Sequence, residues 1–259
     1  AEEEIVRVET PFGFSLRRIT QQEALASPDG GDNKSILRSM SIPPTGKKPF
    51  RGAKRMAVAL RGTDSGISPP SDETQTGQGN LYTVTSASEP ARTDSEQPSQ
   101  DEFLKSDTFV QSSHPKIKAM AERIVGGETD PWKKSLLISD WVYKNLKKLS
   151  VFSIPSALEV LESREGDCNE HTVLFTALAR AAGVPARIDI GLVWSDTLNG
   201  FYYHAWPEVF VGRWIWMEPT LGQPIADATH LKLLGGDIQS WTLLLPYLGR
   251  LEIEVMEIG

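Results

Sequence analysis

The sequence contains a single cysteine, Cys168, among its 259 residues. One cysteine cannot form an internal disulfide, so cysteine usage does not indicate an oxidising or a reducing compartment. No apolar run approaches the ~18–20 residues that a membrane-spanning helix needs, and no secretory signal pattern is visible. The formal net charge of −7 also argues against a nucleic-acid partner, because such a partner usually requires a basic face.

Tryptophan is absent from the N-terminal part of the chain, since all seven tryptophans lie between Trp132 and Trp241. The N-terminal part instead contains short β-branched or aromatic segments separated by polar stretches. These segments predict strands at residues 4–9, 12–19, 55–60 and 81–85. The stretches 62–80 and 86–100 are rich in small and polar residues and predict loops.

The sequence therefore predicts an unequal division of the chain. Residues 1–90 form a β-rich accessory region without recognisable chemistry, and residues 91–108 form a linker. Residues 109–259 form a second domain, in which helix caps and apolar periodicity are much clearer. In that domain we expect helices beginning at residues 115, 131, 157 and 168, followed by strands at 187–194, 201–211 and 213–217. Helices followed by antiparallel strands define an α+β fold class.

Cys168 is predicted to lie at the start of a helix. Asp167 and Glu170 have the spacing of a capping box, which makes Cys168 the first helical residue. The unpaired N–H groups and the helix dipole favour a negative charge there, so we expect a lowered pKa and a reactive thiolate. The same N–H groups could stabilise an oxyanion during acyl transfer. The alternative is a small buried hydrophobe, the usual role of a free cysteine.

A catalytic thiol needs a base, and the chain offers four histidines. His114 precedes a proline at a helix start and is expected to be structural. His171 lies three residues after Cys168 on the same helix, so its side chain points along the helix; a direct role stays open. His230 lies in a turn that enters a strand, and we expect a structural or indirect role. His204 lies in an aromatic strand that would hold it rigidly, and it is the best candidate base.

The third member of such a site should be an acid or an amide near His204. Glu218 is the first candidate, and its position depends on the hairpin loop around residues 211–213. A two-residue loop puts Glu218 on the wrong face of the strand. A three-residue loop, or a one-residue bulge, places it opposite Trp206 and diagonal to His204. Glu208, two residues along the same strand, is the alternative partner. Without such a loop, Glu218 would be a solvated acid at a strand end.

Four segments together resemble the transglutaminase-like superfamily of cysteine enzymes, in the order and spacing of that family. They read REGDCNEH (residues 164–171), LARAAGVPAR (178–187), HAWPEV (204–209) and WMEPT (216–220). The resemblance covers about residues 109–259 and implies a papain-like core. It also implies Cys168 as nucleophile, His204 as general base and acid, and Glu218 as the group that orients the histidine. The family usually has aspartate at that last position.

The resemblance implies acyl transfer or hydrolysis at amide bonds of a peptide or protein, with a peptidase or amidase favoured over protein cross-linking. No cofactor is expected. A zinc site made of Cys168, His171 and His204 is weak, because structural zinc usually takes four ligands with paired spacings. Trp206 and Asn169 are the candidate substrate-binding residues.

Two other functions remain open from the sequence. The chain could be a weakly active or inactive peptide-binding module, because Glu218 departs from the usual aspartate. It could also be a structural protein with a buried thiol. The chain looks most like bacterial members with an extra β-rich N-terminal region, which implies a periplasmic or other extracytoplasmic location.

Overall fold

The structure is a computed structural model that describes residues 7–9, 15–17, 41–63, 68–90, 100–149 and 155–259. The helices of the C-terminal half begin where the sequence predicts. They are α3 (Pro115–Val125), α4 (Pro131–Asn145), α5 (Ala157–Ser163) and α6 (Cys168–Ala181). Local capping explains their start points: Asp130 Oδ1 accepts from Lys133 N at 3.0 Å, and Ser156 and Glu159 complete a capping box. No helix of the described ranges is both long and apolar enough to span a membrane.

A four-stranded antiparallel sheet follows the helices in the chain. Its strands are β9 (Ala186–Ser195), β10 (Gly200–Phe210), β11 (Trp214–Trp216) and β12 (His230–Gly236), in the order β11-β10-β9-β12. The first three lie where strands are predicted. The long β9–β10 ladder pairs His204 with Gly191. A side chain at Gly191 would collide with the backbone of Leu231 and the indole of Trp206, so glycine permits the close approach of β12.

A five-stranded sheet is built mostly from the N-terminal region. Its strands are β3 (Thr45–Gly46), β4 (Arg55–Arg61), β5 (Gln75–Gln78), β6 (Leu81–Thr85) and β13 (Glu252–Ile258), in the order β3-β13-β4-β6-β5. The strands β4 and β6 confirm two predicted strands. β5 lies in a stretch predicted as a loop, because the side chain of Gln75 makes two hydrogen bonds with the backbone of Lys232, at 2.8 and 2.9 Å.

The strand β13 departs from the predicted domain division. It belongs by sequence to the region 109–259, yet it pairs with β4 over Glu252–Ile258 and with β3. The region 1–90 therefore does not form a sheet by itself. The strand β13, which lies between β3 and β4 in the sheet, comes from residues 252–258. Pairing between such distant segments leaves no local sequence signal.

The remaining elements are short. They are β1 (Arg7–Glu9) paired with β2 (Ser15–Arg17), β7 (Lys147–Lys148) paired with β8 (Glu165–Gly166), and the 3₁₀ helices η1 (Asp101–Leu104) and η2 (Ile238–Tyr247). The predicted strands at 4–9 and 12–19 lie partly outside the described residues, as do residues 91–99 of the predicted linker. η1 occupies part of the rest of that linker.

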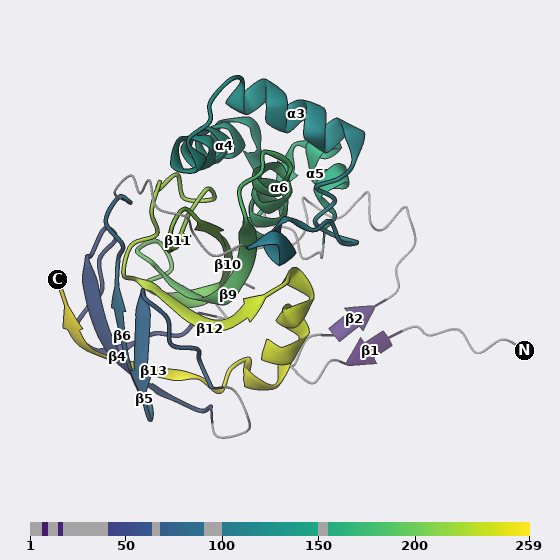
Figure 1. The fold of residues 1–259 in the computed structure, drawn as a ribbon. Helices are drawn as coiled ribbons and strands as arrows, with labels where there is room; N and C mark the ends of the chain where they lie inside the picture. Colours follow the sequence, from purple (N-terminus) through teal and green to yellow (C-terminus); the bar gives the residue numbers. More distant parts are fainter. Residues whose placement is uncertain (1–6, 10–14, 18–40, 64–67, 91–99, 150–154) are drawn as a thin grey trace, which may run out of the picture.

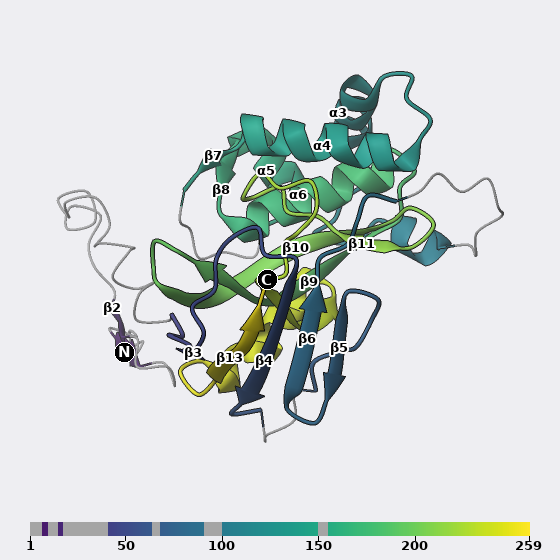
Figure 2. The ribbon, with the colours of Figure 1, turned by 90° about the vertical axis from the view of Figure 1, so that its left-hand side faces the viewer.

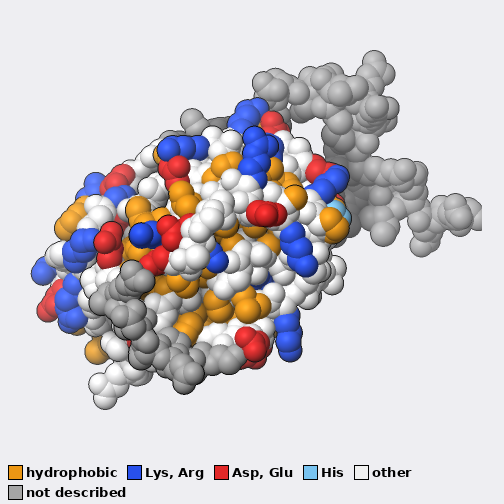
Figure 3. Space-filling view, turned by 45° about the horizontal axis from the view of Figure 1, so that its top comes forward, with side chains coloured by type: hydrophobic (Ala, Val, Ile, Leu, Met, Phe, Trp, Pro, Cys, Tyr) orange, Lys and Arg blue, Asp and Glu red, His pale blue; other side chains and the backbone are white. Residues whose placement is uncertain are grey.

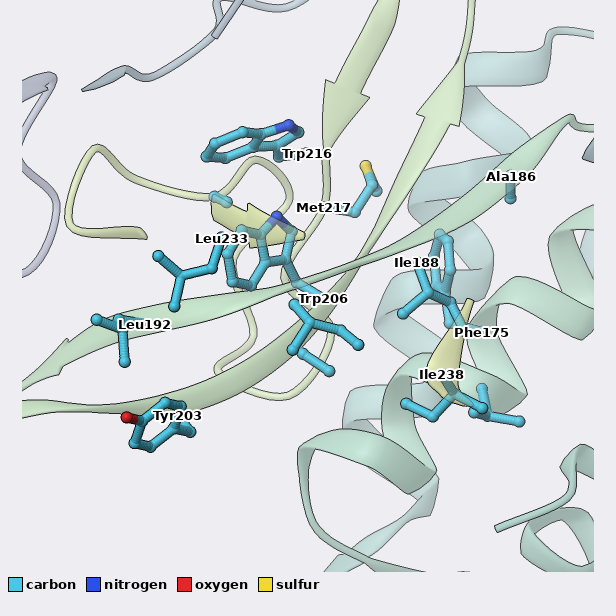
Figure 4. Close-up of a cluster of buried hydrophobic side chains, with 14 of the residues drawn as sticks. Phe175, Ala186, Ile188, Leu192, Tyr203, Trp206, Trp216, Met217, Leu233 and Ile238 are labelled. Atoms are coloured by element: carbon cyan, nitrogen blue, oxygen red, sulfur yellow. The ribbon is translucent and has the colours of Figure 1, made fainter. Parts of the chain in front are cut away.

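The elements form three layers, as Figures 1 and 2 show. The helices cover one face of the four-stranded sheet, and the five-stranded sheet packs on its other side. On the helical face basic and acidic side chains are interspersed (Figure 3). Lys133 and Lys144 of α4 are exposed. Trp206 and Trp216 are fully buried and lie 5.3 Å apart between ring centroids on one side of the four-stranded sheet (Figure 4).

Candidate active site

Cys168 is the first residue of α6, as predicted, and its capping box is complete. Asp167 Oδ1 accepts from the Cys168 N–H at 3.0 Å, and Glu170 Oε2 accepts from the Asp167 N–H at 2.8 Å. Gly166 precedes this turn with φ +153°, and a side chain there would collide with Glu170. The Cys168 N–H is thus occupied by Asp167, so it is not the free oxyanion donor that the sequence suggests.

The Cys168 thiol lies beside polar groups, one of which is bonded to a distant part of the chain. The side chain is half-buried, and Sγ lies 3.9 Å from Asn169 Oδ1. That oxygen also accepts from Trp241 Nε1 at 2.8 Å, so η2 is held beside Cys168. Sequence reasoning missed Trp241, because nothing near it in the chain resembles a site motif. Asn169 is predicted from the sequence to bind substrate. In the structure its side-chain oxygen accepts the hydrogen bond from Trp241.

The acidity of the thiol differs from the prediction. Burial raises the pKa of Cys168 well above its usual value, and the Asp167 carboxylate raises it further. A backbone hydrogen bond from Ala205 lowers it but does not compensate. The prediction of a lowered pKa is therefore wrong. The resting group is a thiol, and a nucleophilic reaction requires a base to take its proton.

The hairpin between β10 and β11 has the register that the site hypothesis requires. The strand pairing leaves a three-residue loop, residues 211–213. A hydrogen bond from Met217 N to the Pro207 carbonyl, 2.8 Å, extends the same register beyond β11. This register brings Glu218 to the face of the sheet that carries His204.

His204 and Glu218 form a buried pair. Glu218 Oε2 lies 2.6 Å from His204 Nε2, and Oε1 accepts from the backbone N–H groups of Thr220 and Leu221, each at 3.0 Å. Burial alone would raise the pKa of Glu218, but His204 and His230 outweigh it and hold that pKa far below its usual range. Glu218 is therefore an ionised acceptor, and His204 donates to it from Nε2.

The second ring nitrogen of His204 is the chemically available one. Nδ1 is buried and has no hydrogen-bond partner within the described part of the chain. The next residue, Ala205, donates a backbone hydrogen bond to the Cys168 sulfur, and its carbonyl accepts from Thr172 Oγ1 of α6 at 3.0 Å. The start of α6 is thus docked on β10 next to His204. An imidazole that donates from Nε2 has its lone pair on Nδ1.

His230 also contacts Glu218, which the sequence did not predict. Its Nε2 lies 2.8 Å from Glu218 Oε2, and its Nδ1 lies 3.0 Å from the Asp227 carbonyl. Burial would lower the pKa of His230, but Asp227 and Glu218 outweigh it and raise the pKa. His230 thus contacts Glu218 directly, which is compatible with the structural or indirect role expected from the sequence.

Glu208 and Trp206, two other candidate site residues from the sequence, have surroundings different from those predicted. Glu208 does not approach His204; its Oε2 lies 2.6 Å from Arg187 Nε and 3.3 Å from Lys232 Nζ. Trp206 differs from the predicted cleft wall, because its side chain has no exposed surface. Its ring stacks on the His204 imidazole at 6.1 Å between centroids, so it supports the histidine from within the core.

The other two histidines have local roles. His114 caps α3, as expected, and its Nδ1 accepts from Lys116 N at 3.2 Å. His171 is buried, and its Nδ1 lies 2.7 Å from the Asp167 carbonyl. Burial lowers the pKa of His171, so its ring is neutral and donates to that carbonyl within its own helix.

Among the described residues, one group of potential metal ligands lies close together. The ligand atoms of His204, Glu218 and His230 all fall within 4.8 Å of one another. The hydrogen bonds from both histidines to Glu218 use these atoms and account for their proximity. The weak zinc set of Cys168, His171 and His204 is not such a group in the described part of the chain.

Comparison with known proteins agrees with the fold. The family model of the transglutaminase-like superfamily matches residues 118–219, which include Cys168, His204 and Glu218. Residues 118–219 are thus similar to the transglutaminase-like superfamily, and the chain has a mixed helix and sheet fold like that of a solved structural neighbour.

Individual relatives are distant. A solved structure of a candidate cysteine protease from Cytophaga hutchinsonii is 17% identical and has a TM-score of 0.50; the match covers 81% of this chain and 85% of that one. The periplasmic domain of TgpA from Pseudomonas aeruginosa is 18% identical, with a TM-score of 0.38, over 48% of this chain and 47% of that one.

An uncharacterized protein of Haemophilus influenzae is 34% identical over 96 residues, 35% of this chain. The matched segment spans only 26% of that relative's length.

Proposed function

We propose that this protein is a cysteine-dependent enzyme that acts on amide bonds of peptides or proteins. Cys168 is the nucleophile, His204 the general base and acid, and Glu218 the group that orients the histidine. The observation that supports this best is the buried His204–Glu218 contact of 2.6 Å, which leaves Nδ1 of His204 as an unpartnered acceptor. The residue next to it, Ala205, donates to the Cys168 sulfur.

In the acylation step, Nδ1 of His204 takes the proton from the Cys168 thiol as Sγ attacks the carbonyl carbon of the substrate. A new S–C bond forms, and the carbonyl electron pair moves to oxygen. The carbon–nitrogen bond then breaks, and the leaving amine takes the proton from His204. The product of this step is a thioester on Cys168. Because the thiol has a raised pKa, proton removal and attack must be coupled.

In the second step, water or an amine attacks the thioester carbon, and His204 takes a proton from it. The C–S bond breaks, and the Cys168 sulfur recovers the proton from His204. Water gives a carboxylic acid, whereas an amine gives a new amide. Glu218 stays ionised throughout and balances the positive charge that His204 carries in each step.

A second candidate is a peptide-binding module without turnover. It is favoured by one observation: His204 and Glu218 have almost no exposed surface, and burial raises the pKa of the thiol. A groove around Cys168 would then hold a peptide that the buried histidine cannot reach. This candidate predicts peptide binding without loss of the peptide.

The single cysteine makes the test direct, because every thiol adduct must be on Cys168. We would measure the rate of iodoacetamide alkylation by mass spectrometry from about pH 6 to pH 9 for the wild type, His204→Ala and His114→Ala. The enzyme hypothesis expects the wild type to react about tenfold or more faster than His204→Ala near pH 6. His114→Ala is the matched control and should behave as the wild type does.

Turnover is tested with a pool of fluorescence-quenched peptides, with and without a fluorescent primary amine. Peptide cleavage that is lost in Cys168→Ser supports hydrolysis, and amine incorporation supports transfer. Equal alkylation rates for the wild type and His204→Ala, with no peptide cleavage, would contradict the enzyme hypothesis. Peptide binding under those conditions would support the binding module.

The extracytoplasmic location is part of this proposal and rests on the sequence resemblance. Fractionation of cells that produce the native protein tests it. Recovery with periplasmic or outer fractions supports it, and recovery with cytoplasmic markers contradicts it.

A further inference from the structure

The N-terminal region contacts Asp227, an aspartate close to the candidate active site. The backbone N–H of Gly52 donates to Asp227 Oδ2 at 2.8 Å, and Arg51 Nη2 lies 3.3 Å from the same oxygen. The other oxygen of Asp227 accepts from the Thr229 N–H at 2.9 Å. Burial would raise the pKa of Asp227, but His230 and Arg51 outweigh it, so the carboxylate is ionised.

Asp227 is connected to the proposed catalytic residues through His230. The Nδ1 atom of His230 lies 3.0 Å from the Asp227 carbonyl and 3.5 Å from its carboxylate Oδ1. The Nε2 atom of the same ring lies 2.8 Å from Glu218 Oε2. Both ring nitrogens therefore face acceptors, and a ring that donates from both carries a positive charge. The His230 side chain is fully buried between the two carboxylates.

The backbone around Asp227 is held by the same N-terminal region. The Ala228 N–H donates to the Ala53 carbonyl at 2.9 Å, and Ser86 Oγ donates to the Ala226 carbonyl at 2.9 Å. The segment that carries Asp227 is thus clamped on both sides of the aspartate. Its position is set by residues far away in the chain.

We propose that His230 and Asp227 are positioning residues that hold Glu218 in place for His204, and that Arg51 and Gly52 anchor them. This inference rests on the proposed function for its catalytic meaning. The inference gives the β-rich N-terminal region a role. Its residues Arg51 and Gly52 hold one end of a continuous series of contacts, and His204 lies at the other end. The contacts run Gly52–Asp227, Asp227–His230, His230–Glu218 and Glu218–His204.

The physical reason is the shared oxygen of Glu218. Its Oε2 accepts from both histidines, so His230 restricts where the carboxylate can lie while His204 uses it. Loss of the His230 donor would let the carboxylate turn within its cavity, and a small displacement of an orienting group reduces the rate strongly. A merely structural His230 would instead affect folding stability alone.

The test compares His230→Gln, whose amide can donate to Glu218, with His230→Phe, which keeps a ring but has no donor. One readout is the iodoacetamide alkylation rate of Cys168 near about pH 6. The other is the side-chain N–H resonance of His204 in isotope-labelled protein, which reports its hydrogen bond to Glu218 whether or not the thiol is reactive. Circular dichroism and thermal unfolding establish that each variant is folded.

We expect His230→Phe to alkylate about tenfold more slowly and to lose or broaden the His204 resonance. His230→Gln should recover most of both. A folded His230→Phe with the wild-type resonance and rate would overturn the proposal, and so would equal losses in both variants. If the wild type and His204→Ala alkylate equally, the proposed enzyme fails, yet the resonance still decides whether His230 positions Glu218.

The anchor is tested with two arginines of the N-terminal region. Arg51→Ala removes the ion pair to Asp227, whereas Arg61→Ala removes an exposed pair to Glu254 (3.1 Å) and is the matched control. Arg51→Ala should reduce the alkylation rate about threefold or more and shift the His204 resonance, while Arg61→Ala should change neither. Equal behaviour of the two variants would overturn the anchoring role. This pair also decides the proposal if His230→Phe does not fold.

Discussion

Glu218 Oε2 lies 2.6 Å from Nε2 of His204, although this position usually carries the shorter aspartate in the superfamily that the sequence resembles. The three-residue loop at residues 211–213 sets the register of the two strands that carry them. The carboxylate of Glu218 is also held by two backbone N–H groups. The longer side chain therefore fits this hairpin, and the departure from aspartate does not prevent contact with the histidine.

Shortening this side chain should be harmful here. In Glu218→Asp the carboxylate withdraws by one methylene from His204, and we expect alkylation of Cys168 near neutral pH to slow about tenfold. Glu218→Gln keeps the length but removes the charge that balances a protonated His204, and we expect a loss of about 10²-fold. Alkylation kinetics followed by mass spectrometry give both values. A Glu218→Asp variant as fast as the wild type would contradict the fit described above.

Acid should destabilise the fold through two buried carboxylates. The folded-state pKa values of Glu218 and Asp227 are depressed, so their stabilising contribution is complete above their unfolded values of about 4. It is lost as the pH falls towards the folded values. We expect the midpoint of thermal unfolding to decrease below about pH 5, and to decrease less in Glu218→Gln.

The contribution of His230 has the opposite sign. Its folded-state pKa is raised, so its stabilising effect is complete below the unfolded value of about 6.5 and is lost as the pH rises through the folded value. His230→Gln should flatten the alkaline side of the stability profile and also weaken the acid side, because His230 helps to depress the pKa of Glu218 and Asp227. A change confined to the acid side would contradict this assignment.

The turn just before Cys168 requires glycine at position 166. In Gly166→Ala the new methyl group collides with the Glu170 side chain, and φ +153° is unfavourable for alanine. We expect a lower urea midpoint and slower alkylation of Cys168, because Glu170 closes the capping box at the start of α6. Gly127→Ala is the control, since a methyl group there meets no neighbouring atom within 4 Å. Equal midpoints for the two variants would argue against this role.

A buried lysine holds three carboxylates together away from the thiol. Lys232 Nζ lies 3.0 Å from Asp72, 2.9 Å from Asp189 and 3.3 Å from Glu208. Lys232→Met leaves these acids without their shared cation, and we expect a loss of about 3–5 kcal/mol in the free energy of unfolding. Urea denaturation measures it.

Asp189→Asn provides the contrast for that network. Burial raises the pKa of Asp189, so its charged form is already disfavoured and its removal should cost much less than the loss of Lys232. If Asp189→Asn proved as harmful as Lys232→Met, the charge of Asp189 would have to be essential to the network.

Structural features that depend on residues close together in the sequence could be predicted. The capping boxes at Ser156–Glu159 and Asp167–Glu170 depend on a spacing of three residues, and both are present. The β10–β11 hairpin could be treated as a choice between two loop lengths, because strand pairing alternates with a period of two. The position of Glu218 beside His204 followed from that choice.

Features that depend on distant contacts were not predictable in this way. Trp241 meets Asn169 across 72 positions, and Gln75 meets Lys232 across 157. The raised pKa of Cys168 has the same origin, because the helix start favours the thiolate locally while tertiary burial opposes it. Such effects depend on which segments pack together in the folded protein. A single sequence does not give this information.

The place of β13 in its sheet has a consequence for how the chain folds during synthesis. Because β13 lies between β3 and β4, the five-stranded sheet cannot close until residues 252–258 have left the ribosome. Until then β4 presents an unpaired edge, which is open to wrong pairing. Gly52, which donates to Asp227, lies just before that strand. The contacts that anchor the candidate active site therefore cannot all form until β13 has been synthesised and has paired with β4.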